Sequence, residues 1–343
     1  MIKFDQAYDG DQEVFYGGNF MDPFSHAVIG TALSKAAGCG INFSTPENIG
    51  LVVGSVFPDI DIILKRWGNY VYLKNHRAVT HSLIGLIISS VFISAILKLI
   101  FPTSSFIGIF LYSMIGCLSH TVSDILNSYG AKLLWPFYKR KMALNLIVII
   151  DPLVILFLLG YIFGDRSISL VSILVLGLYI LLRLVYKLLI REQLEKSYPS
   201  MKIVSVIPSM LAIFKWHFVM EDDEVLLVGE KNILNGKINI IEKFPKLNYN
   251  KIEKALNSTL GKFFMDFTPV FHVSAESIGE INRYTFTDLR YYHRNNFYHH
   301  GVLEMDKADS IVKSSFKPYT MNKEHKIPEN FNKGIAKNKF FKC

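Results

Sequence analysis

Cysteine is scarce in this chain, and the positions of the few present exclude several kinds of site. Only three occur among 343 residues, at Cys39, Cys117 and Cys343. They are odd in number and far apart, so they form neither a CxxC metal pair nor a disulfide framework. Cys117 lies in an apolar run, where we expect it to pack rather than react. The pattern fits a protein that faces a reducing cytoplasm.

The first twenty residues lack the features of a signal peptide. They contain no basic n-region and no apolar h-region. Met21 begins the segment MDPFSHAVIG, which resembles folded protein more closely. We therefore expect residues 1–20 to be a non-structural leader or the product of a misassigned start, with Met21 as the true start.

The chain divides into an apolar part and a mixed part. Residues 82–190 are almost continuously apolar, and the mean hydropathy of the whole chain is +0.28. The net charge of +8 would suit nucleic acid or an anionic membrane surface, and the long apolar runs favour the membrane. We predict a membrane-embedded domain at 21–198, a cytoplasmic α+β domain at 199–306, and a basic, disordered tail at 307–343.

Four segments are long and apolar enough to cross a bilayer, which takes about 20 helical residues. They are residues 82–101, 105–126, 143–163 and 168–190. Two shorter apolar stretches, 26–39 and 49–57, are too short to cross. We expect these two to be helices packed against the cytoplasmic side of the bundle, which makes the fold mainly α.

Basic residues in the loops orient the predicted spans. The short loops at 102–104 and 164–166 carry no net charge, whereas the segments at the opposite ends of the spans are basic. Since basic residues flank cytoplasmic ends, both termini should lie in the cytoplasm. The basic residues concerned are Lys65, Arg66, Lys74, Arg77, Lys132, Lys139, Arg140, Lys141, Arg191, Lys196 and Lys202.

This topology gathers ligand-type side chains at one membrane face. His120 and Asp124 are spaced i, i+4, so both point from the same face of a helix. They are expected to meet His76 and His81, because the second predicted span ends where the first begins. The complete set of candidates is His26, Asp59, Asp61, His76, His81, His120 and Asp124.

Seven candidates are enough for two metal ions with an open position for water, since a catalytic zinc uses about three protein ligands. Thr80 is a plausible N-cap, which would leave His76 on the preceding loop. If residues 59–61 are extended, their two carboxylates diverge, so one would ligate while the other orients a His or binds a second ion.

Individual candidates also have simpler interpretations. A single His at a membrane interface is often only an amphipathic anchor, and Asp61 could form a surface pair with Lys65 or Arg66. Asp151 lies inside a predicted span, where a carboxylate is costly. It is expected to support the site or to pair with a basic group near the bundle axis.

These motifs resemble a family of bacterial membrane-bound, metal-dependent hydrolases, one branch of which is described as LexA-binding inner-membrane hydrolases. The resemblance covers residues 22 to about 160 and is carried by SHAVIG around His26, PDID at 58–61, NHRAVTHS at 75–82, LSHTVSDILNSYG at 118–130 and WPF at 135–137. It implies a metal-dependent hydrolase, and a subgroup adds a soluble C-terminal domain.

The order of the ligands is also similar to that of zinc-dependent phospholipase C. That likeness implies a first shell of His26, Asp59, His76, His120 and Asp124. No His-x-x-x-Glu follows Asp124, so the ligands for a third metal are missing. We expect one or two ions, Zn2+ with Mn2+ as an alternative.

The C-terminal half has the pattern of an α+β domain. An amphipathic helix is expected at 249–259, and Asn235-Gly236 is a tight-turn signal. His293, Arg294, His299 and His300 could bind metal, but a solvated hairpin is the preferred interpretation. Strands are expected at 202–207, 215–220, 224–228, 237–241, 270–274, 282–288 and 298–305.

Two classes of function remain open. The first is a hydrolase that cleaves a phosphoester, with metal roles for the five residues above and catalytic roles for Asp59, Asp61 and His81. Its expected partners are membrane lipids, with a phospholipid or another phosphoester as substrate and no nucleic acid. The second is a non-enzymatic membrane protein braced by metal, whose C-terminal domain binds a regulatory partner. The sequence leaves the oligomeric state open.

Overall fold

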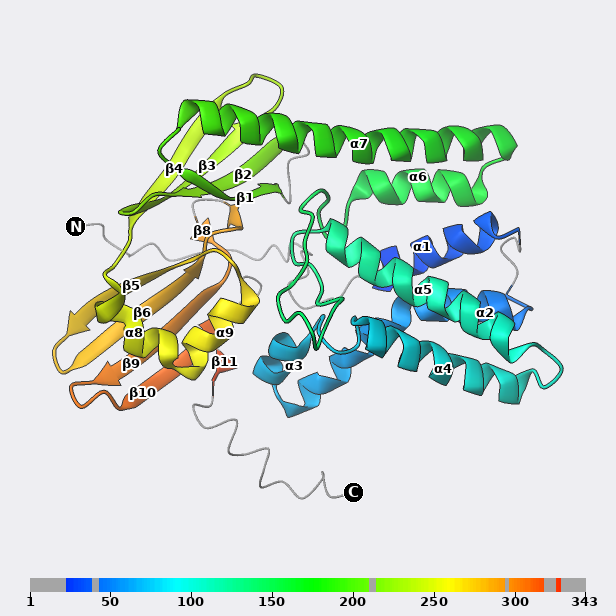
Figure 1. Ribbon diagram of the computed structural model, residues 1–343, viewed down its shortest axis with the longest axis horizontal. Coiled ribbons are helices and arrows are strands. Elements are labelled where there is room, and N and C mark those ends of the chain that lie inside the picture. The colour runs from blue at the N-terminus through cyan, green and yellow to red at the C-terminus, as the bar shows by residue number, and fades with distance from the viewer. Residues whose placement is uncertain (1–22, 39–42, 210–213, 294–295, 318–324, 328–343) are drawn as a thin grey trace, which may run out of the picture.

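The chain folds into a bundle of helices and a C-terminal part built on β-sheets. The computed structural model describes residues 23–38, 43–209, 214–293, 296–317 and 325–327 (Figure 1). The predicted leader at 1–20 lies outside these residues. The helical part comes first along the chain, and the sheets lie at one end of the bundle.

Three helices in the described part of the chain are long and apolar enough to cross a membrane: α4 (Leu83–Ile100), α5 (Phe106–Leu126) and α7 (Arg166–Ser197). Each begins where a side-chain oxygen accepts a hydrogen bond from a backbone N–H. Ser82 caps α4, so the prediction of Thr80 as the cap is wrong. Cys117 packs in the apolar core, as predicted.

The third predicted span is shorter than expected. Only α6 (Pro152–Phe163, 12 residues) is helical, and the predicted helix is wrong for 143–151. Asp151 accepts hydrogen bonds from the backbone N–H groups of Leu153 and Val154, and Pro152 occupies the first helical turn, so this carboxylate starts the helix. At about 1.5 Å per residue, α6 alone is about 18 Å long.

The two short N-terminal helices, α1 (Pro23–Ala36) and α2 (Pro46–Val56), lie inside the bundle. Figure 1 shows them alongside α5 and α6, so the prediction that they pack on the cytoplasmic side is wrong. Glycine permits this close packing: a Cβ on Gly54 would lie 2.4 Å from the Ser113 carbonyl oxygen, and one on Gly116 would lie 2.1 Å from that of Leu51.

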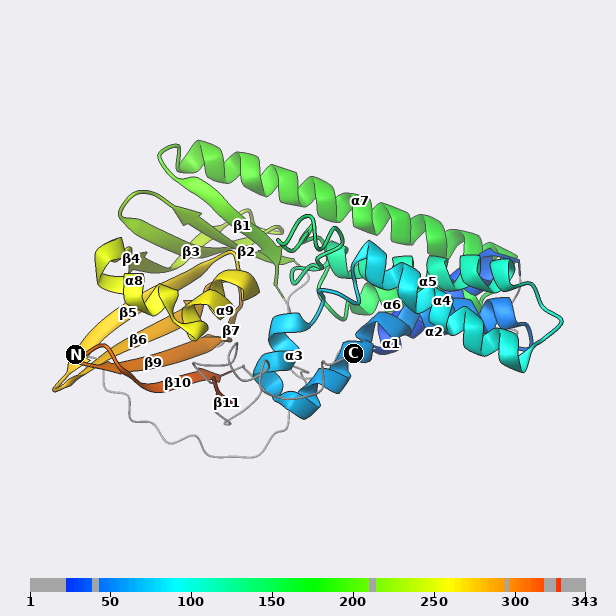
Figure 2. The ribbon, with the colours of Figure 1, turned by 60° about the horizontal axis from the view of Figure 1, so that its bottom comes forward.

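A short 3-10 helix, η1 (Phe57–Trp67), and helix α3 (Asn69–Asn75) follow α2. Residues 59–61 are therefore helical rather than extended. Helix α3 lies against α9 (Thr259–Phe267) of the C-terminal part, where Tyr70 packs on Phe263 (Figure 2). The segment that connects α2 to α4 thus bridges the bundle and the C-terminal part.

The C-terminal part contains two larger antiparallel sheets. The end of α7 covers the first sheet, because Ile190 and Leu194 share a core with Trp216 and Phe218. The first sheet has the order β1-β2-β3-β4 and the second β11-β10-β9-β6-β5, with β7-β8 as a separate hairpin. The bounds are β1 Lys202–Pro208, β2 Lys215–Glu221, β3 Val225–Asn232, β4 Ile238–Pro245, α8 Tyr249–Asn257, β5 Phe271–Ile278, β6 Ile281–Asp288, β7 Tyr292–His293, β8 Asn296–Phe297, β9 His300–Asp306, β10 Ile311–Lys317 and β11 His325–Lys326.

The second sheet extends beyond the predicted domain end. Strand β10 pairs with β9, and Phe316 is buried in the core that α9 covers. The prediction of a disordered tail is therefore wrong for 311–317 and for 325–327, because β11 pairs with β10 and Ile327 is buried in the same core. Residues 318–324 and 328–343 lie outside the described part.

The close packing at Gly54 predicts opposite effects for two glycine-to-alanine changes. Gly54→Ala forces α2 away from α5 and should lower the free energy of unfolding by about 1–3 kcal/mol. Gly177→Ala in α7 is the matched control, because no described atom lies within 4 Å of its Cβ position. It should be neutral or stabilise by about 0.5–1 kcal/mol. Unfolding in detergent followed by circular dichroism measures both, and equal effects would contradict the packing.

Candidate metal centre

All seven candidate residues converge at the end of the bundle that faces the sheets. The side chains come from α1, η1, the turn before α4, and the last turns of α5. Six are buried, and His76 is partly exposed. The residues brought together are His26, Asp59, Asp61, His76, His81, His120 and Asp124.

Four of these residues place one atom each at distances typical of a metal cage. His81 Nε2 lies 3.4 Å from Asp59 Oδ1 and 3.2 Å from Asp124 Oδ2. His120 Nε2 lies 3.3 Å from Asp59 Oδ1, 3.0 Å from His81 Nε2 and 3.7 Å from Asp124 Oδ2. In a tetrahedral site with bonds of ~2.0–2.1 Å, neighbouring ligand atoms are about 3.3 Å apart. Asp59, His81 and His120 therefore form a donor set that fits a divalent ion, and Asp124 adjoins them. We call these four residues the cage.

The second nitrogen of each cage histidine is held from behind. His120 Nδ1 donates to the Ser55 carbonyl at 2.8 Å. His81 Nδ1 lies 3.0 Å from the Thr80 hydroxyl, which donates to Asp61 and therefore accepts from the histidine. These contacts place the proton on Nδ1 and leave the Nε2 lone pair facing the cage, as second-shell partners do for metal-ligating histidines.

Two further histidines extend the cage on either side. His26 Nε2 lies 3.8 Å from Asp124 Oδ1, and its ring stacks on His120. His76 Nδ1 lies 3.1 Å from both oxygens of Asp61. Three overlapping ligand groups result: His26 with His120 and Asp124, Asp59 with His81 and His120, and Asp59 with Asp61 and His76. The arrangement is compatible with one or two ions.

Asp61 differs from the two cage carboxylates. Besides His76, it accepts hydrogen bonds from the Arg77 backbone N–H and the Thr80 hydroxyl, both at 3.2 Å. It is buried and bonded to the turn that carries three site residues. Its contacts are those of a group that orients the site, and its burial distinguishes it from the surface carboxylate that the simpler interpretation assumed.

The sequence pattern did not reveal the partners of Asp124. Arg77 Nη2 lies 3.0 Å from Asp124 Oδ1, and Arg77 Nη1 donates to Asn127 Oδ1 at 3.1 Å. Asn127 Nδ2 in turn donates to Asp124 at 3.3 Å. Arg77 has a φ of 62°, a conformation that is uncommon for a side chain of this size and typical of functional sites. The signal in the sequence that could have placed Arg77 at the site was its position directly after His76.

Burial and neighbouring charges shift the pKa values of Asp59, His81 and His76 in opposite directions. Burial would raise the pKa of Asp59, but hydrogen bonds with His120 and His81 hold it well below its usual range. Burial would lower the pKa of His81, but Asp124 and Asp59 raise it to about 9. Burial lowers the pKa of His76 despite Asp61. The two carboxylates therefore favour the protonated form of His81.

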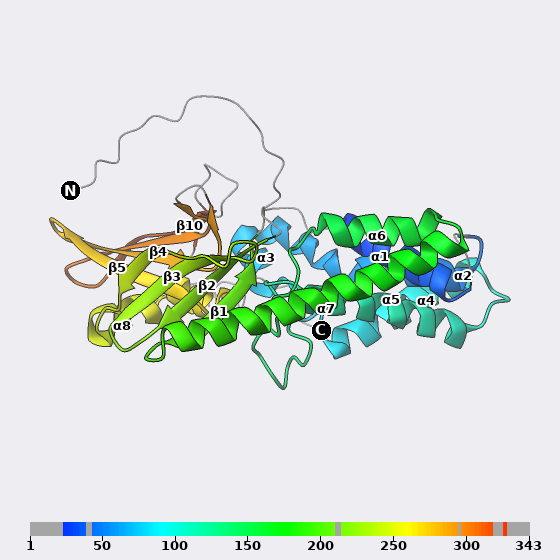
Figure 3. The ribbon, with the colours of Figure 1, turned by 90° about the horizontal axis from the view of Figure 1, so that it is seen from above.

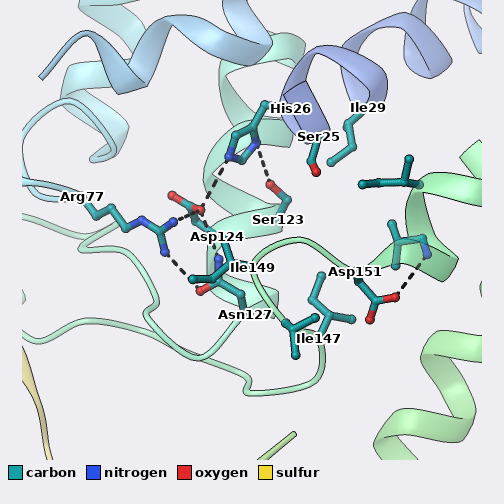
Figure 4. A pocket seen from close by; sticks show the side chains of 13 residues that line it. Ser25, His26, Ile29, Arg77, Ser123, Asp124, Asn127, Ile147, Ile149 and Asp151 are labelled. Carbon is teal, nitrogen blue, oxygen red and sulfur yellow. Dashed lines mark hydrogen bonds and ion pairs between the residues drawn. The ribbon is translucent and has the colours of Figure 1, made fainter. Parts of the chain in front are cut away.

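A small cavity of about 30 Å³ adjoins the cage. His26, Asp124, Arg77 and Asn127 form one side, and Asp151 lies on the other, at the start of α6 (Figure 4). A water molecule needs roughly 10–15 Å³ of such space, so about two fit. Asp151 also accepts a hydrogen bond from Tyr179 at 2.8 Å. It caps a helix and lines the cavity, and the ring of its partner Tyr179 lies 5.8 Å from the Arg183 guanidinium.

The C-terminal part contacts the site through Tyr129, five residues after Asp124. The Tyr129 ring stacks on Tyr291, and its hydroxyl lies 3.1 Å from His299 Nε2. Arg77 lies 5.7 Å from the centre of the Tyr129 ring. Tyr291 donates to the Ser128 hydroxyl at 2.9 Å. We call Ser128, Tyr129, Tyr291 and His299 the joint.

The joint corrects the interpretation of the C-terminal histidines. His299 is buried there, so the prediction of a solvated hairpin is wrong for this residue. His300 Nε2 donates to the Phe297 carbonyl at 2.8 Å, between the start of β9 and the preceding strand β8. The side chain of His293, and Arg294, lie outside the described part.

Comparisons with known proteins agree with this architecture. Residues 21–192 match the family described as YdjM inner membrane protein, and residues 250–326 match the YfhP C-terminal alpha/beta plait domain. The chain is 28% identical over 320 residues to a Bacillus subtilis (strain 168) protein named "Uncharacterized protein YfhP", which covers 89% of this chain and 97% of that protein. No solved structure matches.

The helices and the first match define a membrane protein with a buried His and Asp cluster. The chain belongs to the YdjM inner membrane protein family, because this match covers half of its length. The family resemblance carried by the His and Asp motifs is thereby confirmed.

The cage predicts that His81 is a metal ligand. His81→Ala removes an Nε2 at the centre of the cage and should abolish stoichiometric metal in the detergent-purified protein. His300→Ala should leave metal content unchanged, because its imidazole is hydrogen-bonded to Phe297 within the C-terminal part. Mass spectrometry of bound metals distinguishes the two, and retention of metal by His81→Ala with loss by His300→Ala would place the metal elsewhere.

The joint predicts that the C-terminal part supports the metal site. Tyr291→Phe keeps the ring stack but removes the hydrogen bond to Ser128, so the free energy of unfolding should fall by about 0.5–1.5 kcal/mol. Metal affinity, measured by Co2+ titration, should weaken severalfold. Tyr284→Phe is the control, because its hydroxyl makes no hydrogen bond among the described residues. Unchanged metal affinity in Tyr291→Phe would mean that the joint holds the two parts of the protein together without supporting the metal site.

Proposed function

We propose that this protein is a membrane-bound, metal-dependent hydrolase that cleaves a phosphoester at the membrane surface. The observation that carries the proposal is the cavity beside the cage. A structural metal site is closed by protein ligands, whereas a catalytic site keeps a position for water. Here about 30 Å³ of space lies against His26 and Asp124.

The residues fit a hard or borderline divalent ion. Imidazole nitrogens and carboxylate oxygens are ligands that Zn2+ and Mn2+ share, and the only described cysteine, Cys117, lies in the apolar core of the bundle. We propose His81, His120 and Asp59 as the ligands of one ion, which leaves a fourth position open to water, with Asp124, His26 and His76 available to a second ion. Zn2+ is the preferred ion on the geometry of the cage.

Bound in the cage, the ion would lower the pKa of a water molecule and polarise a phosphoryl oxygen. Hydrolysis of a phosphoester forms one P–O bond from water and breaks the ester P–O bond, and the water proton leaves with the departing oxygen. We propose Arg77 as the group that contacts the phosphoryl oxygens, because it lines the cavity and its Nε has no hydrogen-bond partner among the described residues. We propose Asp61 as a positioning residue for His76 and His81.

The proposal includes the side of the membrane. The ends of α4, α5 and α7 that adjoin the site carry the basic residues of the chain's loops, which favours a cytoplasmic site with both termini on that side. Helix α6 then completes a fourth crossing together with the irregular residues 143–151. Membrane lipids are the proposed partners, and a phospholipid or another phosphoester is the proposed substrate.

A metal-braced protein without enzymatic activity is the second candidate. It is favoured by the full burial of His81, His120 and Asp124 and by the direct contact of Tyr129 with the C-terminal part. In that function a closed shell of four ligands would fix the loops that the C-terminal part contacts. The two candidates differ in whether water reaches the ion.

Activity with matched variants separates the candidates. The purified protein, loaded with Zn2+ or Mn2+, is assayed on bis(p-nitrophenyl) phosphate and on a fluorescent phospholipid in micelles. Chelation should abolish turnover and metal should restore it. Arg77→Lys should retain metal but lower kcat by about 10²-fold, since it loses a preorganised donor to the transition state.

The control for this experiment is Arg283→Gln, which removes an exposed pair with Glu304 on β6 and β9 and should leave kcat unchanged. Stoichiometric metal without turnover on either substrate, and a Co2+ spectrum of a closed tetrahedral site, would support the second candidate instead.

A further inference from the structure

The end of the bundle that adjoins the C-terminal part exposes apolar side chains outside the helices that cross the membrane. In η1, Ile60, Ile62 and Ile63 are exposed, and Trp67 is 64% exposed. These residues alternate with Asp59 and Asp61, which are buried against the site. One side of η1 therefore holds the metal centre, and its other side presents isoleucine and tryptophan outward.

A second apolar surface lies in the loop between α5 and α6. Phe137 is 90% exposed, and Leu134 and Tyr138 are also exposed. Lys139 and Arg140 follow directly and are exposed as well. If this loop were surrounded by water, its aromatic surface would be exposed at a considerable cost in free energy. An exposed apolar patch of this kind usually marks a binding surface.

The two surfaces lie at the same level along the bundle. Figures 1 and 3 place η1 and the green loop between α5 and α6 where the bundle meets the C-terminal part, on different sides of the axis. Both adjoin α4: Phe57 of η1 packs against Phe92 of α4, with ring centroids 5.8 Å apart, and the Leu83 backbone N–H donates to the Leu133 carbonyl at 2.9 Å. The apolar side chains therefore continue the apolar surface of the membrane-crossing helices.

We propose that η1 and residues 134–140 form a belt that inserts into the headgroup layer of an anionic bilayer. The occupant is the lipid surface, because the belt continues the lipid-facing helices and because Lys65, Arg66, Lys139 and Arg140 complement anionic headgroups. Aromatic side chains are enriched at this depth. A protein partner is the alternative that the experiment excludes or supports.

The belt fixes the depth of the metal centre. Asp59 and Asp61 belong to the same eleven-residue helix as the inserted isoleucines. If that helix lies in the headgroup layer, the cage lies at the level of lipid phosphates. This placement holds whether or not the site hydrolyses anything, so the inference does not depend on the proposed function.

The tryptophans provide the test. The chain contains three tryptophans. Trp67 in η1 and Trp135 in the 134–140 loop both belong to the belt, and Trp216 is fully buried in the C-terminal core. The full-length protein is reconstituted in vesicles of phosphatidylcholine with phosphatidylglycerol, some brominated near the top of the acyl chain and others deeper. Trp67→Phe and Trp135→Phe together should remove most of the quenching by shallow bromine, and Trp216 should remain unquenched.

Two single-probe variants make the result independent of the native tryptophans. In the Trp67→Phe, Trp135→Phe background, Phe137→Trp places a probe at the most exposed belt position, and Val312→Trp places one on β10 as the control. Shallow bromine should quench the first probe and spare the second, and aqueous iodide should do the reverse. Equal iodide quenching of both probes in vesicles would overturn the proposal and assign this surface to water or a protein.

Charge is tested in the same vesicles. Replacing Lys65, Arg66, Lys139 and Arg140 by Gln should reduce the difference in bromine quenching between anionic and neutral vesicles severalfold, while metal content stays unchanged. A difference that persists undiminished would show that these four residues do not contact the anionic lipid, and it would overturn the charge component of the proposal.

Discussion

The charge of two buried carboxylates, Asp59 and Asp124, imposes the main constraint on this structure. An ionised carboxylate removed from water costs several kcal/mol unless opposite charge and hydrogen bonds compensate it. The chain provides that compensation from three separate segments: His81 and Arg77 from the turn before α4, His120 from α5, and His26 from α1. Most of the packing at this end of the bundle serves to hold these groups in place.

The need to compensate these two charges also constrains how the helices pack. The Ser55 carbonyl can accept a hydrogen bond from His120 only if α2 lies almost in backbone contact with α5. Gly54 and Gly116 allow that approach, since any larger residue would meet a carbonyl oxygen. The small residues of the bundle and the orientation of a ligand histidine are therefore parts of one arrangement, and so is the position of α2 inside the bundle.

The sequence predicted the site better than it predicted the path of the chain. The seven candidates could be found because His120 and Asp124 share a helix face and because basic residues oriented the spans. The sequence could not reveal that 59–61 is helical, since a run of three residues has no period. Helix α6 begins late because Asp151 caps it, which hydropathy does not register. Arg77 and Tyr129 escaped notice because their partners lie up to 170 residues away, as for Tyr129 and His299.

Helix α7 has a mechanical consequence for the whole molecule. Its 32 residues run without interruption from the far end of the bundle to the sheet that it covers, about 48 Å at the usual rise (Figure 3). Because this helix is continuous and has no hinge, a change in the tilt of its membrane-embedded turns rotates the sheet through the same angle. Packing against neighbouring helices and anchors at the membrane surface set the tilt of such a helix. The contacts that α7 makes inside the bundle therefore also set the orientation of the β1–β4 sheet.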